Sequence, residues 1–172
     1  MKHLHQNNFG DHLRSRLGGA LRIAIVGIGD ELSPVDRLGM IAAQEIERLH
    51  IPGIKVFFAG TMPESMTGPL RAFNPGHVLL LASADMGARP GTIEVIKPGK
   101  IHASLVSSHA LPLSVVMEFI AKDSKTRVTL LGIQPNIAAH DTGLSGEEVE
   151  YLNQNLADLY AIIRDIGDKQ AG

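Results

Sequence analysis

Asp36 and His109 are two side chains whose positions suit metal binding or proton transfer. Asp36 follows an apolar segment that ends at Gly27, and His109 precedes one that begins at Leu111. Carboxylate oxygen and imidazole nitrogen are ligands of divalent metals, and imidazole also carries protons near neutral pH. Each residue has a structural interpretation as well, because Asp36 completes a Ser-x-x-Asp helix-capping pattern with Ser33 and His109 can hydrogen-bond within its loop. Taken alone, the spacing favours these structural interpretations.

Three other acidic residues follow apolar segments. Asp85 begins Asp-Met-Gly, which is typical of a turn in which aspartate accepts backbone N–H groups. Asp30 and Glu31 follow the Gly-x-Gly of Gly27 and Gly29. This is not a dinucleotide fingerprint, because the third glycine is missing and two carboxylates would repel a phosphate.

Composition excludes several classes of protein. The 172 residues include 16 Lys and Arg against 18 Asp and Glu, so bulk positive charge for nucleic-acid binding is absent. There is no cysteine for a disulfide, a thiolate metal site or a nucleophile, and no Gly-x-Ser-x-Gly motif. The polar first residues do not resemble a signal peptide, and no apolar run approaches the ~20 residues of a membrane helix. We therefore expect a soluble, cytoplasmic protein without nucleic-acid or membrane partners.

Apolar runs alternate with helical patterns along the chain. The runs that predict strands are 23–27, 54–59, 77–82, 92–97 and 127–131. Continuous apolar runs are typical of strands buried on both faces. The pattern predicts a single three-layer α/β/α domain with a mostly parallel, roughly five-stranded sheet, and we expect 23–27, 54–59, 78–82 and 128–132 to be its central strands.

Capping residues and helical periodicity predict the helices between these strands. Ser33 is expected as N-cap of a helix with Pro34 at its first position. Shorter helices are expected over 63–73 and from about 111 to 122. Ser145 and Glu148 form a capping box for the last helix, in which Val149 is expected to face inward.

The expected organisation is a flexible N-terminal arm over 1–20, the domain over 21–166 and a C-terminal tail over 167–172. In a parallel α/β sheet, ligands gather at the carboxyl ends of the strands. That rule selects the loops 27–36, 59–64, 82–89 and 132–141, and His109 can reach the same edge.

Four segments resemble, in order, those of the nickel–iron hydrogenase maturation endopeptidases, especially the branch that serves hydrogenase 3. They lie within about 22–163 and are Ile25-Val26-Gly27-Ile28-Gly29 with Asp36, Leu79 to Gly87 with Pro90-Gly91, Ser108-His109-Ala110-Leu111-Pro112-Leu113, and Leu131-Gly132-Ile133-Gln134-Pro135. The resemblance implies a phosphorylase/hydrolase-like fold. It also implies an endopeptidase that removes the C-terminal extension of a hydrogenase large-subunit precursor after nickel insertion.

In this family two carboxylates and one histidine are thought to read the nickel of the substrate. Carried over by position, the first carboxylate is Asp36 and the imidazole is His109, and both become candidate catalytic residues and metal ligands. The metal is then substrate-borne nickel or another divalent ion that the free protein binds weakly. We expect Asp36 and His109 to lie within about 10 Å of each other, since metal–ligand distances are near 2 Å.

The second carboxylate of the family aligns with Ala82, whose methyl group cannot bind a metal. Either another acidic residue replaces it, with Asp85 as a candidate metal ligand and Asp30 or Glu31 as alternatives, or the protease activity is lost. In the second case the protein would act as a chaperone or scaffold that binds a hydrogenase-like subunit.

Overall fold

A five-stranded sheet forms the centre of the molecule, in a computed structural model that describes residues 6–104, 106, 112–138 and 144–172. The strand order is β2-β1-β3-β5-β4, with all neighbours parallel except the antiparallel pair β4 and β5. The strands are β1 (Ile23–Ile28), β2 (Ile54–Gly60), β3 (His77–Ser83), β4 (Ile93–Val95) and β5 (Arg127–Ile133). The predicted mostly parallel α/β architecture is confirmed.

The middle of the sheet is buried, but its edge differs from the prediction for 54–59. Every residue of β1 and β3 is buried. β2 was expected to be central, and this is wrong: it occupies one end of the sheet and pairs with β1. Its apolar residues pack against both core clusters, Ile54 and Val56 on one face and Phe57 and Ala59 on the other. The Phe57 ring contacts that of Phe73 at a centroid distance of 5.9 Å, while Phe58 stays 42% exposed.

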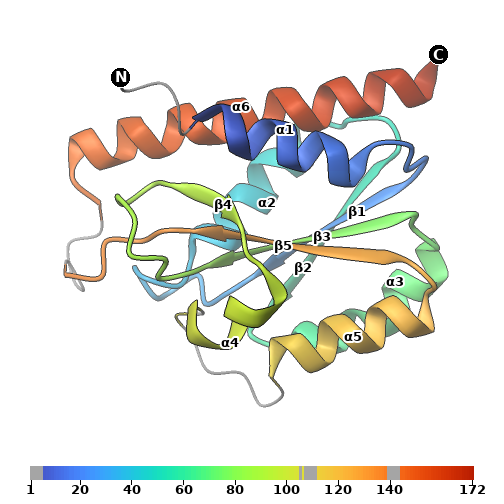
Figure 1. Cartoon of the computed structure of the whole chain (residues 1–172), viewed down its shortest axis with the longest axis horizontal. Helices are drawn as coiled ribbons and strands as arrows, with labels where there is room; N and C mark the ends of the chain where they lie inside the picture. The colour runs from blue at the N-terminus through green and yellow to red at the C-terminus, as the bar shows by residue number, and fades with distance from the viewer. Residues whose placement is uncertain (1–5, 105, 107–111, 139–143) are drawn as a thin grey trace.

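Helices cover both faces of the sheet, as predicted (Figure 1). One layer contains α1 (Gln6–Leu17), α2 (Leu38–Arg48) and α6 (Gly146–Ala171). The other contains α3 (Thr67–Phe73), α4 (Ile101–Ser104) and α5 (Leu113–Asp123), together with the short 3-10 turns Pro63–Met66 and Pro98–Lys100. Two separate apolar clusters, one on each face of the sheet, form the core.

Both ends of the described chain pack on the domain, which differs from the expected arm and tail. Leu13 and Leu17 of α1 are fully buried in the core cluster that α6 also joins. α6 continues to Ala171, and Gly167 lies so close to Ile51 that a side chain there would overlap it. A short helix was expected only over 11–17, within a flexible arm; α1 is longer, and its apolar stripe packs on the core, so it belongs to the domain.

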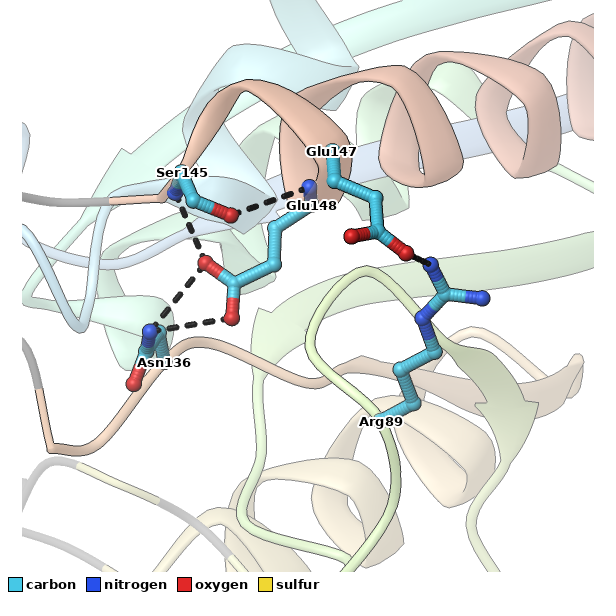
Figure 2. Close-up of polar contacts among 5 residues, drawn as sticks. All are labelled: Arg89, Asn136, Ser145, Glu147 and Glu148. Atoms are coloured by element: carbon cyan, nitrogen blue, oxygen red, sulfur yellow. Dashed lines mark hydrogen bonds and ion pairs between the residues drawn. The ribbon is translucent and has the colours of Figure 1, made fainter.

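The start of α6 confirms the predicted capping box (Figure 2). Glu148 N–H donates to Ser145 Oγ at 3.3 Å, and Ser145 N–H donates to Glu148 Oε2 at 2.7 Å. These hydrogen bonds, first among them that from the Ser145 backbone, lower the pKa of Glu148. Asn136 Nδ2 donates to the same carboxylate, so the helix start is joined to the segment after β5. Val149, expected to face inward, is 41% exposed, since the buried stripe begins one turn later at Leu152.

Within the described residues, the apolar stretches of the helices are too short for any of them to cross a membrane.

Candidate active site at the carboxyl edge of the sheet

Asp36 lies in the loop that leads from β1 to α2, with only 6% of its surface exposed. Its Oδ2 accepts a hydrogen bond from the N–H of Asp30 at 3.1 Å. Two consecutive turns shape the loop, since Ser33 N–H donates to the Asp30 carbonyl and Asp36 N–H donates to the Ser33 carbonyl. The side chain is therefore oriented by its own loop at the edge where ligands bind in such sheets.

Gly29 allows this loop to close. Its φ is +139°, and a Cβ atom there would overlap the Asp36 carbonyl oxygen. Its N–H donates to the Gly60 carbonyl at 2.8 Å, which ties the loop to the end of β2. The Gly-x-Gly segment thus serves the close approach of Asp36 rather than a phosphate.

The helix after Asp36 does not begin where the capping pattern predicts. α2 begins at Leu38, so Ser33 is not its N-cap and Asp36 is not in its first turn. The first N–H of the helix, that of Leu38, donates instead to the buried Ser83 Oγ at 3.2 Å. The hydroxyl of Ser83, at the end of β3, therefore accepts the helix N–H that Ser33 was expected to accept. The capping interpretation of Asp36 is wrong.

Gly39 brings α2 against the same two strand ends. A Cβ atom at this position would lie 2.5 Å from the Ile28 carbonyl oxygen and closer still to that of Leu81. Only glycine permits this approach of helix and sheet, which holds the start of α2, two residues after Asp36, against the ends of β1 and β3.

Ala82, where the family resemblance expects a carboxylate, is 3% exposed and pairs with Gly132 of β5. It belongs to the apolar cluster on the α3–α5 face of the sheet, with Ala84 and Leu80 among its members. The side chain at position 82 is thus a buried methyl group in apolar surroundings.

Asp85 makes the hydrogen bonds of a turn residue. Its Oδ1 accepts from Gly87 N–H at 3.2 Å and from Gln134 Nε2 at 3.2 Å, and the residue is exposed. Asp30 Oδ1 is similarly engaged with Leu32 N–H, and Glu31 accepts from Gln44. These contacts support the turn interpretation of Asp85, and its role as a metal ligand stays a prediction.

Gln134 is a residue of this edge that the sequence interpretation did not single out. It is 3% exposed, and its Oε1 accepts from the N–H groups of Met86 and Ala88 at 2.6 and 3.3 Å. Its backbone pairs with Gly91 and Thr92. Gln134 therefore shapes the whole loop after β3, and its only sequence signal was its place beside Pro135 in the late segment of the resemblance.

The prediction that Asp36 and His109 approach each other lies outside the described residues, because His109 does. Across 6–104, 106, 112–138 and 144–172, no three His, Cys, Asp or Glu side chains are grouped to hold a metal ion.

Exposed apolar side chains accompany Asp36 at this edge. Leu32, in the same loop, is 93% exposed, and Met62, just after β2, is 57% exposed. Both residues follow the carboxyl ends of strands, β1 and β2, and so lie at the same edge of the sheet as Asp36.

The structure is that of a single-domain α/β protein with a mostly parallel sheet. A buried aspartate, Asp36, lies in the loop after its first strand, at the edge where such sheets bind ligands. A family model described as hydrogenase maturation protease, of the HycI type, matches residues 40–161. The chain belongs to this family, and this membership makes it a peptidase by class.

Relatives and solved structures agree with the family. A provisionally named hydrogenase maturation protease from Methanocaldococcus jannaschii is 29% identical over 150 residues, which are 80% of this chain and 89% of the relative. The hydrogenase 3 maturation protease of Escherichia coli is 28% identical over 111 residues, 64% of this chain and 70% of the relative. The crystal structure of a [NiFe] hydrogenase maturation protease HycI from Thermococcus kodakarensis is similar with a TM-score of 0.73 and 29% identity, covering 91% of this chain and 99% of that one.

Proposed function

We propose that the protein is an endopeptidase that removes the C-terminal extension from a nickel-loaded nickel–iron hydrogenase large-subunit precursor. The observation that carries this proposal is the buried Asp36, oriented by Asp30 N–H at the carboxyl edge of the sheet. This is the position at which the resemblance expects the first carboxylate. Family membership supports the reaction class.

Asp36 and His109 are the proposed ligands for the nickel that the substrate brings. Nickel accepts both imidazole and carboxylate ligands, so the chemistry of this pair suits the metal. With Ala82 in place of the second carboxylate, this chain supplies two ligands, and we expect the free protein to bind nickel or another divalent ion weakly. The bound metal would distinguish a precursor that already contains nickel, and it would polarise groups near it.

Cleavage of the extension is hydrolysis of one amide. Water adds through its oxygen to the carbonyl carbon, the C–N bond breaks, and the new amine takes up a proton. In the proposed complex Asp36 positions the metal-bearing end of the precursor, and the exposed Leu32 and Met62 contact the surface of the precursor around it. Reaction in the cytoplasm is part of the same proposal.

A decisive experiment follows the mass of a nickel-loaded precursor during incubation with the protein. We expect loss of the C-terminal extension with the unmodified chain and a rate reduced at least about a hundredfold with Asp36→Asn, which keeps the shape but removes the charge. Asp123→Asn is the matched control, because Asp123 lies at the far end of α5 in an ion pair with Arg71.

Binding of the precursor without shortening would refute the endopeptidase and support the scaffold alternative, which the absence of a carboxylate at position 82 leaves open. Equal loss of activity in Asp36→Asn and Asp123→Asn would refute the assignment of Asp36.

A further inference from the structure

A second cluster of polar side chains lies at the opposite end of the sheet from Asp36. His77 and Arg127 are the first residues of β3 and β5 and are partners in the parallel register. Thr129 lies two residues further along β5, and its Oγ1 is 2.8 Å from His77 Nε2. Alternate residues of a strand share a face, so Arg127 and Thr129 lie on the same side of the sheet.

One nitrogen atom in this cluster, Nε of Arg16 near the end of α1, is buried without a hydrogen-bond partner. The imidazole of His77, a residue that is only 2% exposed, lies between the Arg16 backbone carbonyl and the Thr129 hydroxyl. Among the described residues, neither Arg16 nor Arg127 forms an ion pair with a carboxylate. Buried polar groups in folded proteins are almost always paired, so the Arg16 guanidinium indicates a missing partner.

A cavity of about 560 Å³ brings these residues together. It opens beside β5 because β4 ends at Val95 and the chain then turns at Pro98, which leaves the first residues of β5 uncovered by a described strand. Its polar wall is Arg16, His77, Thr126, Arg127 and Thr129, and its apolar wall includes Pro98, Ile101, Met117 and Val128.

The cavity offers hydrogen-bond donors and positive charge. Burial, followed by the charges of Arg127 and Arg16, lowers the pKa of His77 to about 4 against a weaker opposing effect of the Arg16 carbonyl. The imidazole is therefore neutral near pH 7, and the charge comes from the two guanidinium groups. Glu118 also lines the cavity, but its carboxylate is paired with Lys122 at 2.7 Å.

We propose that this cavity binds a small phosphorylated molecule, with the phosphate between Arg16 and Arg127 and the organic part against Met117 and Val128. Two guanidinium groups without carboxylate partners match the double charge of a phosphate better than the single charge of a carboxylate. The hydroxyl groups of Thr126 and Thr129, which also line the cavity, provide further hydrogen-bonding groups. The site is separate from the proposed peptidase edge and does not depend on it.

An NMR titration of the full chain with phenyl phosphate, inorganic phosphate and benzoate tests the proposal. We expect saturable shifts of the backbone amides of His77, Arg127 and Thr129, with affinity highest for phenyl phosphate and lowest for benzoate. Arg127→Gln and Arg16→Gln should each lower the affinity for phenyl phosphate at least about tenfold. Arg14→Gln is the matched control, because Arg14 is exposed on the same helix and does not line the cavity.

Amide spectra of the free variants establish that each is folded before titration, and the exposed Arg127 is the substitution least able to disturb the core. Absence of saturable shifts up to about 10 mM phenyl phosphate would overturn the proposal, since that limit corresponds to negligible affinity. Equal weakening by Arg14→Gln would also overturn it, because the effect would then be general charge attraction. Benzoate binding as tightly as phenyl phosphate would overturn the preference for phosphate.

Discussion

Replacement of Gly39 by alanine tests whether the close contact between α2 and the sheet is required. In most helices this change is favourable by up to about 1 kcal/mol, because alanine has the higher helix propensity. Here the new Cβ would lie 2.5 Å from the Ile28 carbonyl oxygen and closer to that of Leu81, whereas real Cβ contacts are at least 3.0 Å. Both obstacles are backbone atoms of buried strands, so the helix itself must move.

Such overpacking costs about 1–3 kcal/mol, which exceeds the gain in propensity. We expect Gly39→Ala to lower the free energy of unfolding by about 1–2 kcal/mol, or the melting temperature by roughly 2–8 °C for a chain of this size. Urea unfolding followed by circular dichroism measures the difference at constant m-value.

Gly68 provides a matched control. Like Gly39 it is the second residue of its helix, but a Cβ atom there would meet nothing within 4 Å. Gly68→Ala should therefore leave the stability unchanged or raise it by up to about 1 kcal/mol. Equal stability of the two alanine variants would refute the reasoning from close approach.

Three further changes test other contacts. Ser83→Ala should destabilise the protein by about 1–2 kcal/mol in urea unfolding, because it leaves the buried Leu38 N–H without its acceptor. Ala82→Asp should tighten nickel binding in calorimetric titration, since it introduces the carboxylate that the family resemblance expects at this position, and Asp85→Ala should not weaken it. His77, with a pKa lowered from 6.5 to about 4, binds a proton more readily in the unfolded chain. The free energy of unfolding should therefore fall by roughly 3 kcal/mol as the pH drops from 6.5 to 4, and His77→Gln should remove that part of the slope.

Each of these changes has an outcome that contradicts it. Ser83→Thr keeps the hydroxyl and should retain most of the stability, so an equal loss in both variants would mean that packing, not the hydrogen bond, matters. Tight nickel binding that disappears in Asp85→Ala would show that Asp85 replaces the missing ligand. An unchanged pH slope in His77→Gln would assign acid sensitivity to other groups.

The sheet could be predicted from sequence because four of its strands are continuous apolar runs between turn residues. Such a run reports burial but not position, which is why β2 was expected in the centre although it lies at the edge. Phe57 packs against Phe73 of α3, Phe58 is exposed, and no second strand lies beside β2, which no local sequence pattern indicates.

The start of α2 could not be predicted because its hydrogen-bond partner is distant in sequence. Ser33 and Pro34 form a good local capping pattern, but Ser83, 45 residues after Leu38, provides the acceptor. Local propensity describes the structure that a segment can form alone, whereas here a tertiary hydrogen bond determines the residue at which α2 begins. The contribution of Gln134 was hidden for the same reason, since its partners Met86 and Ala88 lie 48 and 46 residues away.

The contacts around Ala82 explain how the proposed site can persist without its second carboxylate. Leu81 faces Gly39 through its carbonyl, and Ser83 accepts the first N–H of α2. Both contacts position the helix that follows Asp36, and neither uses the side chain of residue 82, which lies in the apolar cluster on the other face. The absence of a carboxylate at position 82 therefore leaves the contacts that orient Asp36 intact. In the proposed complex, nickel arriving with a precursor would meet a carboxylate that is already oriented.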